Sequence, residues 1–161
     1  MMPRAMTDPV EETPEARVRV MLEQVVEHLD LDAEIEVADD GETITGALIG
    51  EDLGLVIGRH GQTIDALQHL AWRIAIRDSE ERRRVVIDAA GYRDRRAAAL
   101  QGQADQAVAD ALRFSRPVAL DAMSAPERKV VHEYLRDNGD VETYSEGDEP
   151  DRHLVVAPAR P

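Results

Sequence analysis

The spacing of apolar residues along the first third of the chain changes from helical to alternating. Between residues 14 and 30, apolar positions recur every three or four residues, which predicts an amphipathic helix with Thr13 as its N-cap. Apolar residues then alternate with acidic or small polar ones in segments 35–37 and 44–48, which predicts two short strands. An Asp-Gly pair between the two segments is a hairpin signal, so we expect these strands to be joined by a tight turn.

Helical spacing returns in the middle of the chain. A short apolar turn covers residues 53–57, and apolar residues at helical spacing after Gly61 predict a helix that ends near Arg77. The run 82–88 is typical of a strand. The Ala- and Arg-rich run 92–113 predicts a long helix, which we expect to join two halves of the chain.

Strand and helix patterns alternate again in the last third. Residues 116–120 are strand-like, and a Ser-x-x-Glu capping box opens a helix at Ser124 that should end near Asp137, before an Asn-Gly pair. Two further segments, 141–147 and 152–158, indicate a final pair of strands.

This order of elements predicts an α+β protein made of two small units. We expect a disordered acidic tail over residues 1–13, a first unit over 14–90 and a second unit over 91–158, which starts with the joining helix. The 161 residues include no cysteine, so disulfides and thiolate metal sites are excluded, and we expect no cofactor. The sequence contains neither a signal-peptide core nor an apolar run long enough for a bilayer, so we expect a cytoplasmic protein.

Charge is distributed unevenly along the chain. The formal net charge of −14 disfavours a nucleic-acid partner when it is taken alone. However, residues 1–52 hold 3 basic and 15 acidic residues, whereas residues 53–113 hold 10 basic and 8 acidic ones. Of the 19 basic residues 18 are arginine, whose planar fork suits phosphate, although a codon bias explains the same preference. The middle of the chain is therefore locally basic.

The most informative stretch is LGLVIGRHGQTIDALQHLA, residues 53–71, which places two glycines around an Arg-His pair. Three interpretations compete: a plain turn, a nucleotide-phosphate loop, and a clamp for a nucleic-acid backbone. A P-loop needs a Lys-Ser/Thr pair and a dinucleotide loop needs three glycines after a strand, and neither is present. A clamp fits better, because Gly58 and Gly61 allow close approach of main chain to a sugar-phosphate backbone. Arg59 and His60 would then face phosphate at the N-terminus of the next helix.

A second candidate surface lies on the helix expected after the capping box. Arg128, His132 and Arg136 follow one another at intervals of four residues, so they share one helix face, with Lys129 beside it. We expect this face to be an exposed cationic stripe, although the same spacing is common on solvated helices. The apolar residues expected to face the core are Val130, Val131, Tyr134 and Leu135.

Both motifs resemble one protein family. The stretch LGLVIGRHGQTIDALQHLA resembles the KH domain of the Jag family of bacterial RNA-binding proteins, also called the KhpB family. The segments RPVALDAMSAPERKVVHEYL and YSEGDEPDRHLVV resemble the Arg-x-x-x-His domain, called R-three-H, that follows the KH domain in that family. The resemblance implies a type II KH fold and binding of single-stranded RNA. It also implies RNA chaperoning or post-transcriptional regulation linked to cell-wall elongation and cell shape, and a small KhpA-like partner with a single KH domain.

The resemblance assigns two sets of residues to nucleic-acid binding. The KH loop and groove would comprise Ile57, Gly58, Arg59, His60, Gly61, Gln62, Thr63 and Leu67. The R-three-H face, which would bind RNA or single-stranded DNA, would comprise Arg128, Lys129, His132 and Arg136.

An enzyme is not expected. The sequence has no Gly-x-Ser-x-Gly elbow, and the His-Glu pair at residues 132–133 lacks the second histidine of a zinc-protease motif, so we assign no catalytic or metal-binding residues. The rival hypothesis is a protein-interaction adaptor that uses the acidic N-terminal surface and binds RNA only incidentally. A gel shift with short single-stranded RNA separates these two hypotheses.

Overall fold

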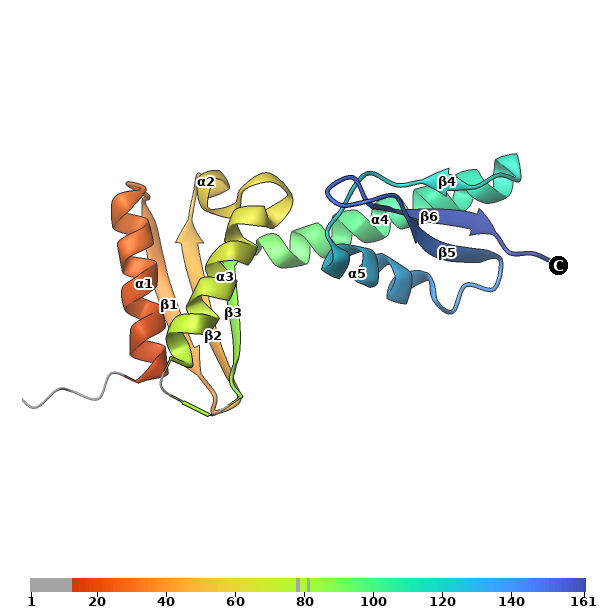
Figure 1. The fold of residues 1–161 in the computed structure, drawn as a ribbon. Helices are drawn as coiled ribbons and strands as arrows, with labels where there is room; N and C mark the ends of the chain where they lie inside the picture. Colours follow the sequence, from red (N-terminus) through yellow and green to blue (C-terminus); the bar gives the residue numbers. More distant parts are fainter. Residues whose placement is uncertain (1–12, 78, 81) are drawn as a thin grey trace, which may run out of the picture. The chain divides into compact units, whose positions relative to one another are not determined.

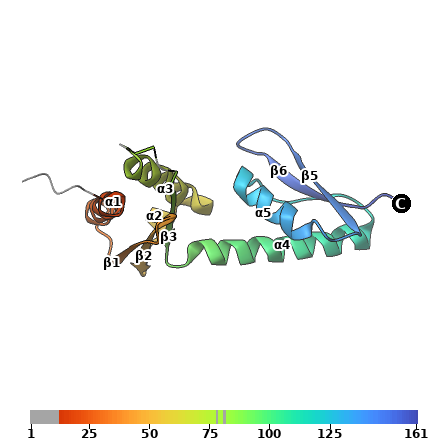
Figure 2. The ribbon, with the colours of Figure 1, turned by 90° about the horizontal axis from the view of Figure 1, so that it is seen from below.

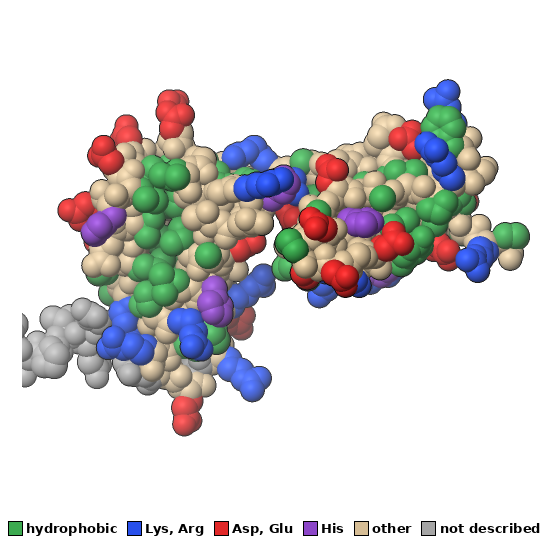
Figure 3. Space-filling model, turned by 45° about the horizontal axis from the view of Figure 1, so that its top comes forward, with side chains coloured by type: hydrophobic (Ala, Val, Ile, Leu, Met, Phe, Trp, Pro, Cys, Tyr) green, Lys and Arg blue, Asp and Glu red, His purple; other side chains and the backbone are tan. Residues whose placement is uncertain are grey.

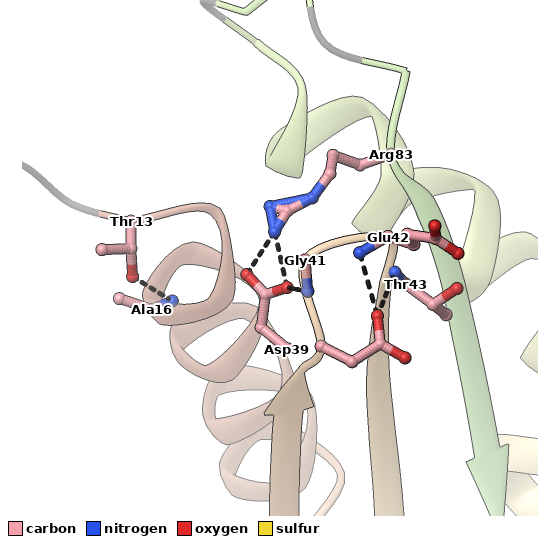
Figure 4. A network of polar contacts seen from close by, with 8 residues as sticks. Thr13, Ala16, Asp39, Gly41, Glu42, Thr43 and Arg83 are labelled. Atoms are coloured by element: carbon pink, nitrogen blue, oxygen red, sulfur yellow. Dashed lines mark hydrogen bonds and ion pairs between the residues drawn. The ribbon is translucent and has the colours of Figure 1, made fainter.

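The computed structural model describes residues 13–77, 79–80 and 82–161. The chain divides into two compact units, unit 1 up to Tyr92 and unit 2 from Arg93 onward. The boundary predicted from the sequence lies between residues 90 and 91. The expected acidic tail lies outside the described residues except for Thr13, which is the N-cap of the first helix and accepts a hydrogen bond from the backbone N–H of Ala16 (Figure 4).

Unit 1 is a three-stranded sheet with two helices on one of its faces (Figure 1). The strand order is β1-β2-β3, with β2 antiparallel to β1 and parallel to β3. The predicted order of helix, two strands, short helix, Gly-x-x-Gly turn, helix and strand is confirmed. Its elements are α1 (Pro14–His28), β1 (Ala33–Asp39), β2 (Thr43–Gly50), α2 (Gly54–Ile57), η1 (Arg59–Gly61), α3 (Gln62–Ala75) and β3 (Arg84–Ala89).

Alternation along β2 packs the sheet of unit 1 against its helices. Ile44 and Leu48 are buried, and Gly46 between them also faces the helices. A Cβ atom at Gly46 would lie 2.8 Å from side-chain carbons of both Leu22 and Ile87, so this glycine lets α1 approach the sheet closely. The same core includes Val18, Met21, Val56, Ile64, Ala71 and Ala75.

A polar network closes the β1–β2 turn at the Asp-Gly pair found in the sequence (Figure 4). The carboxylate of Asp39 accepts a hydrogen bond from the N–H of Gly41 at 2.8 Å and pairs with Arg83, which precedes β3. The carboxylate of Asp40 accepts hydrogen bonds from the N–H groups of residues 42 and 43 at 2.9 and 2.7 Å. Gly41 has a φ of 93°, so glycine is favoured at this position of the turn.

Unit 2 is a three-stranded antiparallel sheet with two helices on one face (Figure 2). The strand order is β4-β6-β5, so the last strand of the chain is central. The helix predicted to end near residue 137 ends at 135, and the strand predicted over 116–120 is reduced to two residues. Its elements are α4 (Tyr92–Phe114), β4 (Val118–Ala119), α5 (Ala125–Leu135), β5 (Val141–Glu146) and β6 (His153–Pro158).

The core of unit 2 is built from a small-residue stripe on α4. Leu100 and three alanines at helical spacing are buried along this helix, which allows α5 and the sheet to pack close to it. On α5 only Val131 and Leu135 reach this core, whereas Val130 and Tyr134, also expected there, are 36% and 43% exposed. The sequence carries two adjacent apolar stripes on α5, and packing uses one of them.

Candidate nucleic-acid interface

The Gly-x-x-Gly segment forms a tight connection between α2 and α3. The chain leaves α2 at Gly58, which has a φ of 73°, and passes through the turn η1 before α3 begins at Gln62. His60 and Gly61 are left-handed, with φ values of 53° and 79°. No side chain caps the start of α3, because its N-cap residue is Gly61. Backbone N–H groups in the first turn of α3 can therefore meet an anion.

Contacts inside the protein also require both glycines. A Cβ atom at Gly58 would lie 2.1 Å from Oγ1 of Thr63, and one at Gly61 would lie 2.7 Å from the Tyr92 ring. From the sequence, both glycines are expected to allow close approach of a nucleic-acid backbone. The structure adds a second reason, since positive φ angles and these neighbours exclude side chains at both positions.

The two residues between the glycines of the loop face solvent. Arg59 and His60 are exposed, whereas Ile57 and Leu67 are partly buried against the core of unit 1. Gln62 and Thr63 are exposed in the first turn of α3. The structure therefore brings all eight residues assigned to the KH loop and groove into one segment and its adjoining helix. A basic, exposed tip stands beside a half-buried apolar surface.

The second predicted surface differs from an open cationic stripe, because Arg128 is only 8% exposed. One terminal nitrogen of its guanidinium donates to the carbonyl of Met123 at 2.7 Å, and the other donates to the carboxylate of Glu149 at 3.0 Å. The expectation that Arg128 lies on an exposed face is therefore wrong. The loop between β5 and β6 carries Glu149 onto the helix, and helical spacing alone cannot reveal that contact.

The other cations of α5 remain on the surface. The side chains of Lys129 and Arg136 are 75% and 62% exposed, and both lie within 4 Å of the Glu133 carboxylate. The ring of His132 is exposed, and its Nδ1 lies 2.5 Å from the hydroxyl oxygen of Thr143 on β5. The predicted face is thus a mixture of a buried arginine, two paired cations and a histidine that contacts the neighbouring strand.

A cavity of about 360 Å³ lies between α5 and β5. Three predicted residues line it, whereas Arg136 does not. The strand side of this cavity comes largely from the YSEG segment of the same family motif, to which no binding residue was assigned from the sequence. The lining residues are Ala125, Arg128, Lys129, His132, Thr143, Tyr144, Ser145 and Leu154.

The hydrogen-bond donors that line this cavity are better suited to binding an anion than to catalysing a reaction. Guanidinium, ammonium, imidazole and hydroxyl groups can all donate hydrogen bonds to phosphate. Within residues 13–77, 79–80 and 82–161, no group of three His, Asp or Glu side chains is placed to hold a metal ion. In the same part of the chain, no helix has both the length and the apolar character that crossing a bilayer requires.

Two family models match the chain in the order of its units. The KH domain of KhpA/KhpB matches residues 15–87, and the R-three-H domain matches residues 98–158. Similar proteins carry the name RNA-binding protein KhpB, which is not the name of an enzyme and agrees with the non-catalytic protein expected from the sequence.

Three of these relatives come from different bacteria. The protein of Clostridium symbiosum is 32% identical over 148 residues, which cover 91% of this chain and 67% of that protein. The protein of Lactiplantibacillus plantarum is 38% identical over 133 residues, which cover 83% of this chain but 41% of that protein. The protein of Bacillus subtilis is 29% identical over 149 residues, which cover 91% of this chain and 72% of that protein. The chain therefore spans between about two fifths and three quarters of these relatives.

Proposed function

The chain belongs to the KhpB family, and from this premise we propose that it binds single-stranded RNA as a non-catalytic protein with two binding modules. The relatives are named as RNA-binding proteins, and this chain carries the same two domains in the same order. KH domains clamp about four nucleotides of backbone on a Gly-x-x-Gly loop.

The observation that carries this proposal is the geometry of the loop at residues 58–61. Its two glycines have positive φ angles, which point Arg59 and His60 outward at the uncapped start of α3. An arginine and a histidine then stand beside the start of a helix, where a phosphate can bind. The partly buried Ile57 and Leu67 offer an apolar surface for the attached bases.

We assign the second module to the cavity between α5 and β5. Lys129 and His132 supply exposed donors there, and Arg128 contributes from a buried position. RNA and single-stranded DNA share the phosphate that these donors recognise. The role of Arg136 in this module is limited to the rim, because it lies outside the cavity lining.

The finer parts of the proposal rest on the family resemblance. They are RNA chaperoning or post-transcriptional regulation in the cytoplasm, a link to cell-wall elongation and cell shape, and a small KhpA-like partner with a single KH domain. The name of the family model that matches residues 15–87 supports the partner, since it joins KhpA with KhpB.

Replacing Arg59 and His60 together with aspartate tests the function. We expect the double variant to lose binding of short single-stranded RNA and to keep its thermal stability, because both side chains are exposed. Binding is measured by fluorescence anisotropy, and stability by the melting temperature.

A triple variant, Gln24→Glu, Gln101→Glu and Gln103→Glu, serves as the control. It changes the net charge by the same amount on exposed helix positions away from the loop. We expect it to bind RNA like the parent. Equal loss in both variants would assign the effect to overall charge, and a lower melting temperature of the loop variant would make the loop a structural turn. A parent chain that binds no RNA would favour the adaptor hypothesis.

A further inference from the structure

The C-terminal end of α4 carries an exposed aromatic ring between two arginines. Phe114 is 52% exposed, and the guanidinium carbons of Arg113 and Arg116 lie 5.2 and 5.4 Å from the centre of its ring. Figure 3 shows blue and green side chains together over this end of unit 2, at the upper right. Cation–π contacts at these distances hold both guanidinium groups beside the ring.

The helix ending explains why both arginines reach one ring. After α4, Ser115 adopts a left-handed φ of 49°, and the N–H of Arg116 donates to the carbonyl of Ala111 at 3.2 Å. This turn folds the chain back over the last helical turn. Arg116 therefore comes back to the end of α4, where its guanidinium lies over the Phe114 ring.

A cavity of about 570 Å³ lies beside this turn. Ser115 and Pro117 line it from one side, and Tyr144 lines it from β5. Arg160 adds a third guanidinium, and Glu142 contributes one carboxylate. Arg160 and Glu142 are the charged residues among those that line the cavity, and Arg113 and Arg116 lie outside the lining, at Phe114.

These three guanidinium groups lack the acidic partners that other cations of unit 2 have. In the part of the chain that the structure describes, no ion pair involves Arg113, Arg116 or Arg160, and all three are exposed. Lys129 and Arg136 on α5, in contrast, lie beside Glu133. Arg113 also complements the negative end of α4, but Arg160 follows β6 and has no such role.

Tyr144 connects this surface with the cavity between α5 and β5. This residue is 44% exposed and lines both cavities, so it borders the donors of α5 on one side and Arg160 on the other. An exposed ring at this position can stack on a nucleobase, which every base permits. Glu142 and Glu146 share the exposed face of β5 with Tyr144, so the positive charge beside this residue comes from Arg160.

We propose that Arg113 and Arg116 at Phe114, together with Arg160 in the neighbouring cavity, bind the backbone of single-stranded RNA while Tyr144 stacks on a base; we call these three arginines the arginine platform. The platform continues the α5–β5 cavity, and the inference rests on the RNA binding proposed above. Planar guanidinium groups donate two hydrogen bonds to one phosphate, and contact with Phe114 orients two of them before RNA arrives. Among the described residues that line the cavity, Glu142 offsets Arg160, so the excess positive charge of the platform comes from Arg113 and Arg116.

The first test removes the charge of the platform in the full chain. The variant Arg113→Gln, Arg116→Gln and Arg160→Gln is titrated with a labelled oligouridylate of about 20 nucleotides, longer than the four that a KH domain holds. We expect affinity to fall about fivefold or more. The slope of log affinity against log salt should fall by up to about 2, because each lost phosphate contact on a single strand contributes about 0.7.

The second test concerns the ring. Tyr144→Leu should weaken binding about fivefold or more, as expected for the loss of one stacked base, whereas Tyr144→Phe should bind like the parent. The triple Gln→Glu variant at positions 24, 101 and 103 changes net charge as much as the platform variant and should bind almost normally. If the Arg→Gln platform variant fails to fold, a variant with lysine at positions 113, 116 and 160 replaces it. The lysine variant keeps the positive charge, so it should keep most of the dependence of affinity on salt while binding RNA more weakly.

The outcomes separate this inference from the proposed function. One outcome would overturn the platform and leave the proposed RNA binding in place. In that outcome the parent binds RNA, the double variant Arg59→Asp with His60→Asp loses binding, and the platform variant binds RNA like the parent. If Tyr144→Phe weakens binding as much as Tyr144→Leu, base stacking is overturned. If the platform variant keeps RNA binding but loses binding to an acidic peptide, the surface belongs to a protein partner. A parent that binds no RNA overturns both proposals.

Discussion

Arg128 and His132 stand four residues apart on α5, yet their side chains have different surroundings. The Arg128 guanidinium is held by the carbonyl of Met123 and the carboxylate of Glu149, while His132 faces solvent and contacts Thr143. A buried, charged donor holds its acceptors more tightly than an exposed one, because water cannot replace the lost bonds. Arg128 therefore ties the β5–β6 loop to α5, in addition to any contact with RNA.

This difference predicts unequal effects of two alanine substitutions. Arg128→Ala should lower the free energy of unfolding by about 1–3 kcal/mol, because it leaves the buried Met123 carbonyl without its charged donor. His132→Ala should lower it by less than about 1 kcal/mol, because the side chain is exposed. Denaturant unfolding followed by circular dichroism measures both values. Equal losses would show that the Arg128 hydrogen bonds contribute no more than a surface contact.

At the scale of elements, the sequence predicts the β1–β2 hairpin well, but it does not predict which side chains of α5 are buried. The Asp-Gly pair determines the β1–β2 turn through local hydrogen bonds, so its neighbours in the sequence suffice to predict it. The buried face of α5 depends instead on distant partners. Val131 and not Val130 is buried because α4 and the sheet reach that side, and Glu149 arrives from 21 residues away to cover Arg128.

The β1–β2 turn should make unit 1 sensitive to acid. The N–H of Gly41 and then the Arg83 side chain lower the pKa of Asp39 below 3.8, and the N–H groups of Thr43 and Glu42 lower that of Asp40. Because a lowered pKa in the folded state favours the charged carboxylate, this stabilisation is present above pH 3.8 and is lost as the pH falls below it.

Asp39→Asn with Asp40→Asn should therefore flatten the dependence of the melting temperature on pH below about 4. The control is Glu34→Gln with Glu36→Gln, which removes two carboxylates from the exposed face of β1 without touching the turn. Melting temperatures between about pH 2 and pH 6 check the difference. If the melting temperatures of the parent and of the Asp39→Asn with Asp40→Asn variant depend on pH in the same way, these carboxylates do not stabilise the folded state.

The glycine loop allows a second comparison at this scale. Gly61→Ala and Gly41→Ala both place a side chain at positive φ, which costs about 1–2 kcal/mol. A Cβ atom at Gly61 would also meet the Tyr92 ring at 2.7 Å, whereas one at Gly41 meets nothing within 4 Å. Overpacking adds about 1–3 kcal/mol, so Gly61→Ala should destabilise the chain more. If the two variants have equal free energies of unfolding, the Tyr92 ring moves aside without an energetic cost.

At the scale of the whole molecule, the order of elements and both motifs can be predicted from the sequence alone. The glycine pair and the Arg-x-x-x-His helix each have a local signature, and hydrophobic spacing reveals the helices and strands around them. The arginine platform has no such signature. Arg113 and Arg116 are close in the sequence, but Arg160 is far from both and comes near them only because β6 pairs with β4 and a left-handed residue turns the chain after α4.

If both modules hold one RNA strand, the length of the RNA should decide how much the second module matters. Lys129→Ala with His132→Ala should weaken binding of long single strands and leave strands of about four nucleotides nearly unaffected, because these fill the KH module alone. This pair leaves Arg128 and its structural contacts intact. Affinity against RNA length, for parent and variant, is the measurement. A loss that is the same at every length would mean that the modules act separately.

The contact between Gly61 and Tyr92 also determines where the chain can be divided for expression. Tyr92 is the first residue of α4, but its ring belongs to the core of unit 1 and lies against the loop at residues 58–61. A fragment that ends at Ala90 omits that ring and leaves the loop without its support. A fragment that includes the first turns of α4 keeps it, so the start of the connecting helix has to accompany the KH domain.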